Sequence, residues 1–451
     1  MKKIYIYTLT LLTLFASCKP DLEVAQLSAG DADFTKYVSI GNSLTAGYSD
    51  GALYEKGQMN SYPTMISKQL NEVGGASVFN LPITSLNGSD GGATGAPGRR
   101  ILAVLPVSDC AGVITGKAVG VTAYTNDDVS TNIYTTGGFQ NMGVPGIKVA
   151  YTQVPSAAFP NLFFNRIAST PAATYMSDVM AQAPTFFTFW LGNNDVLGYA
   201  TSGGSGAIGG FGPADITDAN VFEANVVSFL DTLRDIGAQG IIANIPDVTS
   251  VPFFTTIPAN GLPISRQTQA DSLNGFWAFA GGIYSPTTAL PFQVGSNYFV
   301  IEDSAVATNR RALLPGELLI LTLPQANLKC AGWGSTVPIP AKYVLDLKEI
   351  KTIDSITTIY NNILKTQATA HDFGFVDMNN FLSSFGAGIV YDGVSMDSRF
   401  VQGGIFSLDG VHPTAKGYAL AANEFIKSIN AKYSSILPFV EVNDYEGVLF
   451  P

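Results

Sequence analysis

The stretch "YVSIGNSLTAGYSDGALY", residues 37–54, decides the organisation of the chain. It starts with a short apolar run that ends at Gly41, and Asn42 and Ser43 follow at once. Glycine and asparagine tolerate the backbone angles of a sharp turn, so the pattern predicts a short central strand that ends in a turn. A serine after a strand is, taken alone, more typical of a helix cap. Chemistry at Ser43 requires a base and an anion-stabilising pocket elsewhere in the chain, because serine is a weak nucleophile at neutral pH.

Strand patterns and helix patterns alternate along much of the sequence. Short runs of β-branched and aromatic residues predict three further strands, at 184–192, 240–246 and 375–378. Apolar residues at helical spacing predict four helices, at 61–75, 218–236, 349–374 and 412–430. Strands that alternate with helices imply an α/β fold with a mainly parallel sheet covered on both faces.

Two long segments do not fit this alternation, at about 83–140 and about 250–340, and both are rich in Gly, Thr, Pro and Asn. They are too long for plain loops, so we expect two insertions that form subdomains over the sheet. The aromatic-rich run "NGFWAFAGGIY" (274–284) either lines an acyl or sugar site or packs under a long loop. We expect one domain over 34–440, followed by a tail over 441–451 to which the pattern assigns no element.

The beginning of the chain has the order of a secretory signal: Lys2 and Lys3, an apolar run, then small residues and a cysteine in "FASC". That cysteine resembles the lipobox cysteine of bacterial lipoproteins, which implies a lipoprotein signal peptide over 1–17 and a lipidated Cys18. The alternative is an ordinary signal peptide with an incidental cysteine. The polar residues after it resemble the tethers of outer-membrane lipoproteins. We therefore expect a tether over 18–33 and a location on the bacterial outer membrane, on its periplasmic side or at the cell surface.

The composition limits the partners and cofactors. The net charge is −11, and a negative chain has no general attraction for nucleic acid or anionic lipid headgroups. We expect no nucleic acid partner and membrane contact through the lipid anchor only. With two histidines and no Cys/His cluster the sequence offers no ligand set, so we expect no metal and no cofactor.

The remaining cysteines fit an oxidising compartment. If Cys18 is lipidated, Cys110 and Cys330 are left as an even pair, one in each insertion. They form either a disulfide that joins the insertions or two separate buried thiols.

A second motif follows the strand predicted at 184–192. The stretch "FWLGNNDVLGY" contains "GNND", residues 192–195. An asparagine at this strand end can point its amide N–H at an oxygen beside Ser43 and supply one donor of an oxyanion hole, and Asn194 is the candidate. Asp195 would then buttress the turn. The alternative is an Asn-rich turn whose side chains bond their own backbone.

A third motif, "LDGVHPTAKGY" (408–418), holds one of the two histidines. Asp409 precedes His412 by three residues, close enough for its carboxylate to accept a hydrogen bond from one ring nitrogen and hold the tautomer. The amino-terminal end of the helix that follows favours the neutral imidazole that a general base requires. We interpret the other histidine, His371, as structural, because it lies near the end of a helix before Gly374.

Block by block, "GNSL", "GNND" and "DGVHP" resemble the ordered motifs of the SGNH (GDSL-type) hydrolases. The resemblance implies a flavodoxin-like α/β/α three-layer sandwich that hydrolyses esters through a serine acyl-enzyme. It places the nucleophile on Ser43, the oxyanion-hole asparagine on Asn194, and the acid and base on Asp409 and His412. The stretch "NMGVPGIKV" resembles the remaining block and places the oxyanion-hole glycine at Gly146, whose backbone N–H joins that of Ser43.

The resemblance spans residues 37 to about 430 and leaves out the two insertions. One departure is Asn42, where the family usually has aspartate; because the triad acid is Asp409, this loss of charge is expected to alter turn packing more than chemistry. We expect a lipid-anchored serine ester hydrolase of the esterase/lipase type, with a small-molecule, lipid or glycan ester as substrate. The alternatives are a carbohydrate O-acetyl esterase on glycans and a non-catalytic binding lipoprotein with a degenerate SGNH site, which rests on Asn42 alone.

Overall fold

The computed structural model describes residues 26–451 apart from 86–87, 90–98, 109, 111–113, 123–128, 136–137, 159–160 and 284–291. Cys18, the predicted signal segment and the first part of the predicted tether lie outside the described residues. Among the residues that are described, no helix is both long and apolar enough to cross a lipid bilayer.

Five parallel strands form the central sheet, in the order β13-β6-β5-β1-β4. Their bounds are Tyr37–Gly41 for β1, Asn141–Gly143 for β4, Phe186–Trp190 for β5, Gln239–Ala243 for β6 and Gly374–Val376 for β13. Every residue of β1, β4 and β5 is buried, as expected for parallel strands covered on both faces. The predicted parallel sheet is confirmed.

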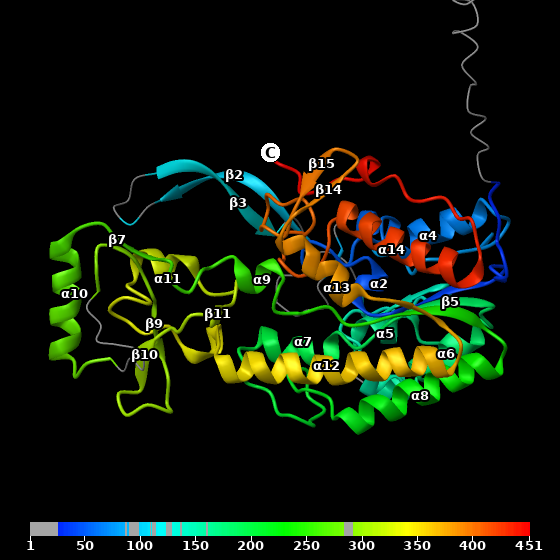
Figure 1. Ribbon diagram of the computed structural model, residues 1–451, viewed down its shortest axis with the longest axis horizontal. Helices are drawn as coiled ribbons and strands as arrows, with labels where there is room; N and C mark the ends of the chain where they lie inside the picture. Colours follow the sequence, from blue (N-terminus) through cyan, green and yellow to red (C-terminus); the bar gives the residue numbers. More distant parts are fainter. Residues whose placement is uncertain are drawn as a thin grey trace, which may run out of the picture.

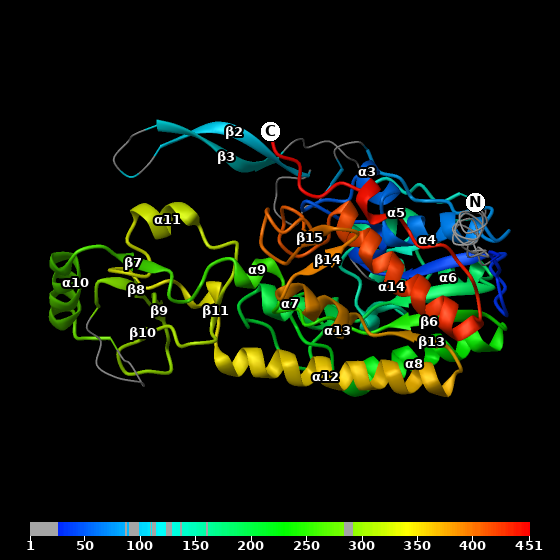
Figure 2. The ribbon, with the colours of Figure 1, turned by 45° about the horizontal axis from the view of Figure 1, so that its top comes forward.

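Helices cover both faces of the sheet (Figures 1 and 2). One face carries α4, Tyr62–Asn71, and α14, Ala415–Tyr433, which pack against each other. The other face carries four helices: α6, Tyr175–Ala181; α7, Asn194–Thr201; α8, Ala219–Asp235; and α12, Leu347–Ala370. The layers form an α/β/α sandwich, so the predicted fold class is confirmed.

Helix α8 shows how the sequence builds these layers. Asp218 caps its first turn by accepting hydrogen bonds from two backbone N–H groups. The buried apolar stripe consists of Phe222, Val226, Phe229, Leu230 and Leu233. Gly237 follows the helix with a φ of +78°, a conformation that glycine adopts without strain. Ile236, the last residue of the helix predicted at 218–236, comes after the last helical residue and is exposed.

Shorter elements complete the main body. Its short α-helices are α2, Ser43–Ala46; α3, Glu55–Met59; α5, Leu162–Ile167; and α13, Met378–Ser383. Its 3₁₀ turns are η1, Val149–Tyr151; η2, Ser156–Ala158; and η4, Ser384–Gly386. An antiparallel pair joins β14, Ile389–Tyr391, to β15, Val394–Met396.

The first insertion contributes an antiparallel hairpin of β2, Arg100–Ser108, and β3, Ile114–Thr122, which projects from the body (Figure 1). The second forms a lobe beyond one end of the sheet, with two small apolar cores of its own (Figure 1). The elements of the lobe are α9, Pro252–Thr255; β7, Leu262–Ile264; α10, Gln267–Phe279; β8, Gly295–Asn297; β9, Val300–Glu302; β10, Arg310–Ala312; β11, Leu318–Leu319; and α11, Gln325–Cys330. Then η3, Ala341–Tyr343, and β12, Val344–Leu345, lead back to the body.

The aromatic-rich run 274–284 lies largely on α10, at the far end of the lobe (Figure 1). Trp277 is buried in one of the lobe's cores, and its indole N–H donates to the carbonyl oxygen of Ser335 at 2.7 Å. The guanidinium of Arg310 lies over its ring. Phe279, by contrast, is 95% exposed. The run therefore packs within the insertion and does not line the cleft at an acyl or sugar site.

A disulfide joins Cys110 to Cys330, with 5.3 Å between the Cα atoms. It links the hairpin of the first insertion to α11 of the second across 220 positions of sequence. The structure therefore has the disulfide, not two separate buried thiols.

The tail over 441–451 begins with η5, Val442–Asp444, whose first residue is fully buried. Further along, Glu446 forms an ion pair with Lys56 of α3. The tail thus packs along the main body.

Candidate active site

The carboxyl ends of β1, β4 and β5 meet at one edge of the sheet, because the pairing sets Gly41 opposite both Gly143 and Trp190. Three of the motifs singled out in the sequence follow these strand ends directly. Open parallel sheets bind ligands at this edge.

Close packing shapes the turn that carries Ser43. A Cβ on Gly41 would lie 1.9 Å from Thr45 Oγ1, so the approach of α2 to its own strand requires glycine. Asn42 caps α2, with its Oδ1 accepting a hydrogen bond from the Leu44 N–H at 3.0 Å. Ser43 is the first residue of the helix and is 7% exposed.

His412 lies between a hydroxyl and a carboxylate. Its Nε2 is 2.8 Å from Ser43 Oγ, and its Nδ1 is 2.9 Å from Asp409 Oδ2. With Nδ1–H donating to the carboxylate, Nε2 is the nitrogen that accepts from the serine hydroxyl. The structure therefore brings together the three residues that the sequence predicted as a catalytic set.

The carboxylate of Asp409 is held by several donors at once. Oδ1 accepts the backbone N–H groups of Val411 and His412, both at 2.8 Å, and Oδ2 accepts that of Gly51 at 2.9 Å. The Ser407 hydroxyl donates to Oδ1 at 3.2 Å. Burial acts to raise the pKa of Asp409, but the interactions with His412 and the backbone outweigh it and lower the pKa to about 2. The group is ionised throughout the neutral range.

Gly146 and Asn194 lie on the wall of the same cleft as Ser43 and His412, a cavity of about 820 Å³. Gly146 has a φ of +78°, in the left-handed region that favours glycine. The Asn194 Nδ2 donates to the carbonyl oxygen of Ile147 at 3.0 Å, which fixes the amide beside the Gly146 turn. Both predicted oxyanion-hole residues therefore line the same cleft as Ser43.

Asp195, on α7, is hydrogen-bonded to the segment that follows Gly146. Its Oδ2 accepts the Val149 N–H at 2.8 Å, and its Oδ1 accepts the hydroxyl of Thr217 at 2.6 Å. Burial raises the pKa of this carboxyl to about 6. The predicted buttress role for Asp195 has a structural counterpart, since these bonds hold the Gly146 segment against the Asn194 helix.

Lys148 is a buried cation on the wall of the cleft. Its ammonium donates to the carbonyl oxygens of Gly212 and Asp215, and burial lowers its pKa. These bonds hold the 207–215 loop over the cleft.

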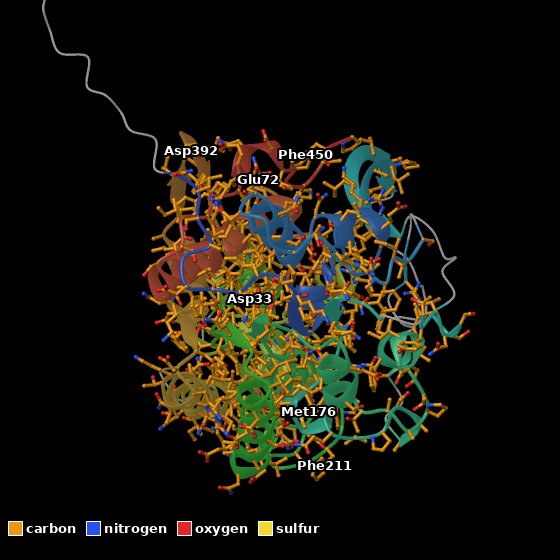
Figure 3. The ribbon with its side chains drawn as sticks, turned by 90° about the vertical axis from the view of Figure 1, so that its right-hand side faces the viewer. Asp33, Glu72, Met176, Phe211, Asp392 and Phe450 are labelled. Carbon is orange, nitrogen blue, oxygen red and sulfur yellow. A yellow bond between two sulfur atoms is a disulfide. The ribbon has the colours of Figure 1, made fainter. Side chains whose placement is uncertain are left out.

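Aromatic rings line much of the cleft, from Tyr48, Tyr151, Phe163 and Phe211. The Tyr151 hydroxyl donates to the carbonyl oxygen of Phe211, and Phe211 itself is 63% exposed at the outer surface (Figure 3). The Tyr48 ring packs against the His412 imidazole, with 4.7 Å between centroids.

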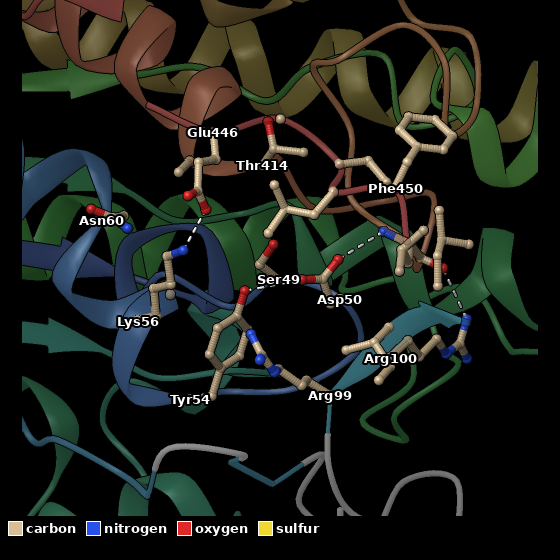
Figure 4. A pocket seen from close by; sticks show the side chains of 18 of the residues that line it. Ser49, Asp50, Tyr54, Lys56, Asn60, Arg99, Arg100, Thr414, Glu446 and Phe450 are labelled. Carbon is tan, nitrogen blue, oxygen red and sulfur yellow. Dashed lines mark hydrogen bonds and ion pairs between the residues drawn. The ribbon is translucent and has the colours of Figure 1, made fainter. Parts of the chain in front are cut away.

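A polar cavity of about 260 Å³ lies behind the catalytic loop, between the tail, the base of the hairpin and the segment after Ser43 (Figure 4). Asp50 is on its wall, with its carboxylate accepting the Leu408 N–H at 3.1 Å and the Tyr54 hydroxyl at 3.0 Å. Burial raises the pKa of Asp50. Asp50 is thus tied to the residue that precedes Asp409, and sequence reasoning missed this support.

The second histidine is elsewhere. His371 Nδ1 is 2.8 Å from the Gln367 carbonyl oxygen, and its Nε2 is 3.0 Å from Asp231 Oδ1. It does not line the cleft at Ser43, which agrees with a structural role. Within the described ranges, no group of three or more His, Cys, Asp or Glu residues is placed to hold a metal ion.

A family model agrees with the motifs. The family model for GDSL-like lipase/acylhydrolase matches residues 37–425. A crystal structure from Parabacteroides merdae, described as a GDSL-like lipase, is similar at 12% identity and a TM-score of 0.34, covering 89% of this chain and 99% of that one. The comparison with curated proteins gives no match. Because the family model covers most of the sequence, the chain belongs to the GDSL-like lipase/acylhydrolase family, a family of hydrolases.

Proposed function

We propose that the protein is a carboxylic ester hydrolase that works through an acyl intermediate on Ser43. The observation that carries the proposal is the unbroken line of hydrogen bonds from Asp409 through His412 to Ser43, at 2.9 and 2.8 Å. An imidazole that is oriented by a carboxylate and bonded to a serine hydroxyl is the arrangement that activates serine as a nucleophile.

In the first half of the reaction, His412 Nε2 takes the proton of Ser43 as Oγ attacks the ester carbonyl carbon. The carbonyl electron pair moves to oxygen, and the resulting oxyanion accepts hydrogen bonds from the backbone N–H groups of Ser43 and Gly146 and from the Asn194 amide. Each such donor is worth ~3 kcal/mol in the transition state. Asp409 stays ionised and stabilises the imidazolium.

In the second half, the tetrahedral intermediate collapses, and the alcohol leaves with the proton that His412 returns. Water then enters, gives a proton to His412 and attacks the acyl-serine. Collapse of this second intermediate releases the acid and restores the Ser43 hydroxyl. The net reaction is ester plus water to acid plus alcohol.

The test is hydrolysis of p-nitrophenyl acetate and butyrate by the wild type and by Ser43→Ala. We expect turnover by the wild type and a loss of ~10³-fold or more in kcat in the variant. Exposed Ser395→Ala, on β15, serves as the matched control and should retain wild-type turnover. Hydrolysis that survives Ser43→Ala unchanged would reject the assigned nucleophile.

A glycan O-acetyl esterase is the rival within this class. The aromatic lining of the cleft supports it, since a wide, ring-lined site suits a bulky alcohol. Acetate release from acetylated xylan, compared with release from p-nitrophenyl acetate, separates the two substrate classes.

Asn42 stands where the family usually has aspartate, and in the structure it has a role as a helix cap. It caps α2 through Leu44, whereas the bonds to His412 come from Asp409 and Ser43. This supports an active enzyme over a non-catalytic binding protein.

We also propose that the chain is anchored to the outer membrane through a lipid on Cys18. The support is the order of charged, apolar and small residues before that cysteine. Metabolic labelling with a radioactive fatty acid should mark the wild type and leave Cys18→Ser unlabelled; equal labelling of both would contradict the anchor.

A further inference from the structure

The segment just after the nucleophile helix contacts the segment that carries the acid and the base. We call these four residues, "YSDG" (48–51), the brace. The Tyr48 N–H donates to the carbonyl oxygen of Ser43 at 3.0 Å, so the brace is bonded to the turn of the nucleophile. Its other end is bonded to residues 407–413, which lie 357 to 364 positions further along the chain.

A side chain and a backbone group of the brace both reach that segment. The Ser49 hydroxyl donates to the carbonyl oxygen of Pro413 at 2.9 Å. The Gly51 N–H donates to Asp409 Oδ2, also at 2.9 Å. Direct hydrogen bonds therefore fix the acid and the base relative to the nucleophile, in addition to their common place at the edge of the sheet.

Asp50 is bonded to both residues that precede the acid. Its carboxylate accepts the Leu408 N–H at 3.1 Å and the Tyr54 hydroxyl at 3.0 Å (Figure 4). Its own N–H donates to the hydroxyl oxygen of Ser407 at 2.9 Å, and that hydroxyl donates in turn to Asp409 Oδ1 at 3.2 Å. Asp50 thus reaches the catalytic acid through two neighbouring residues.

The backbone of Asp50 has an uncommon conformation. Its φ is +54° and that of Gly51 is +80°, so two successive residues lie in the left-handed region. This conformation costs energy for a residue with a Cβ, and aspartate tolerates it better than most. It turns two successive N–H groups toward Ser407 and Asp409. A strained residue that is held in place by surrounding bonds is typical of functional sites.

The first insertion contacts the same position. The N–H of Arg100, the first residue of β2, donates to the carbonyl oxygen of Asp50 at 2.7 Å. The guanidinium of Arg100 donates to the carbonyl oxygen of Leu408 at 3.3 Å. Asp50 and Leu408 are therefore linked both directly and through Arg100. Asp50 itself is not a lining residue of the cleft at Ser43.

We propose that Asp50 is a positioning residue for ester hydrolysis at Ser43. By accepting the Leu408 N–H, it holds the Asp409 carboxylate where that group orients His412. The inference rests on the proposed function. Asp50 contacts neither the substrate nor the proton that moves, so its loss lowers kcat and leaves KM nearly unchanged.

The test compares Asp50→Gly with Asp50→Asn in the hydrolysis of p-nitrophenyl butyrate. Glycine and asparagine both adopt a positive φ readily, but only asparagine keeps a carbonyl oxygen for the Leu408 N–H. Asp50→Gly is expected to lower kcat by about 30- to 100-fold, with KM within about threefold. Asp50→Asn is expected to keep kcat within about threefold of the wild type. Equal losses in the two variants would overturn the proposal.

Asp178→Ala is the matched control for the loss of a carboxylate of this kind. Asp178, on α6, likewise accepts one backbone N–H and one hydroxyl, both from Ser169, at 3.0 and 2.6 Å. The variant is expected to unfold at a lower urea concentration and to keep kcat within about twofold. A loss of kcat as large as that in Asp50→Gly would assign both losses to a general loss of structure and overturn the proposal.

A double-mutant cycle tests whether Asp50 acts through Asp409. In Asp409→Asn the orientation of His412 is already disturbed, so adding Asp50→Gly is expected to lower kcat by less than about threefold. A further loss as large as that in the wild-type background would show that Asp50 acts independently of the acid, which would overturn the proposal.

The outcomes separate this inference from the function on which it rests. Wild-type turnover that Asp50→Gly leaves unchanged overturns the positioning role and leaves the esterase standing. Absence of hydrolysis of any ester by the wild type overturns both.

Discussion

The two histidines of the chain stand at opposite edges of one sheet, and each contacts a carboxylate. His412 is 2.9 Å from Asp409 at the carboxyl edge, and His371 is 3.0 Å from Asp231 just before β13 begins. The distances are nearly equal, so the pairing itself does not distinguish a catalytic histidine from a structural one.

The difference lies in the second nitrogen and in the acid. His412 Nε2 contacts the Ser43 hydroxyl, whereas His371 Nδ1 contacts the backbone carbonyl of Gln367. Asp409 is buried and accepts from several backbone N–H groups, while Asp231 also pairs with Arg234 at the surface. A carboxylate–histidine pair therefore becomes a site only where the free nitrogen faces a reactive group.

The largest difference between the two histidines is expected when each imidazole is removed in turn. His412→Ala is expected to lower kcat/KM by ~10⁴-fold or more, because the general base is lost. His371→Ala should leave kcat/KM within about twofold and lower the free energy of unfolding by about 1 kcal/mol. Ester kinetics and urea unfolding measure the two effects. Similar losses of activity in both variants would contradict the distinction.

The two acids give the next largest contrast. Asp409→Asn keeps the shape of the side chain but disturbs the tautomer of His412, and a loss of ~10³–10⁴-fold in kcat is expected. Asp231→Asn, at the other histidine, should leave kcat unchanged. Steady-state kinetics measure kcat for both variants. Retention of activity in Asp409→Asn would show that the imidazole is oriented by other contacts.

The pH dependence of stability gives a second test of the environment of Asp409. The pKa of Asp409 is about 2 in the folded chain, below its usual value, so its stabilisation is present above about pH 4 and is lost as the pH falls toward 2. Urea unfolding between pH 2 and 5 should show a slope that Asp409→Asn reduces. An unchanged slope would place the acid transition on other carboxylates.

The oxyanion pocket is expected to contribute less than the triad. Asn194→Ala should lower kcat by about 10²–10³-fold with a small change in KM, because its amide N–H bonds the transition-state oxyanion more strongly than the substrate carbonyl. Asn225→Ala, outside the cleft, provides the control. A change confined to KM would assign Asn194 to substrate binding alone.

The smallest expected effect concerns Asp195, whose pKa shift has the opposite sign. Its pKa is raised to about 6 by burial, so the folded chain holds this proton more tightly and loses stability as the pH rises from about 4 to 6. Asp195→Asn should remove about 2 kcal/mol of this decline. Urea unfolding at pH 4 and pH 7 measures it, and an identical decline in the variant would contradict the shift.

Local patterns predicted the sheet edge well. The runs at β1 and β5 identify two buried strands; β1 ends at Gly41, and β5 ends at Trp190, two residues before Gly192. Asp409 and His412 are only three residues apart, so their contact is local. Parallel pairing then brings the strand ends together without further information from the sequence.

The supports of the site could not be predicted in this way. Gly51 donates to Asp409 across 358 positions and does so through a backbone N–H, which leaves no mark in the side-chain pattern. Asp50 bonds the Leu408 N–H over a similar separation. The insertions are likewise shaped by their own small cores and a disulfide, which local patterns do not reveal. The cleft at Ser43 takes its walls from elsewhere, chiefly from residues 145–163 and 194–213.

The most direct test of the central claim is covalent labelling with a fluorophosphonate, read by intact mass and peptide mapping. One equivalent on Ser43 is predicted in the wild type, with no label on Ser43→Ala and labelling of His412→Ala slowed by ~10³-fold or more. A label on another residue, or equally fast labelling without His412, would contradict the account.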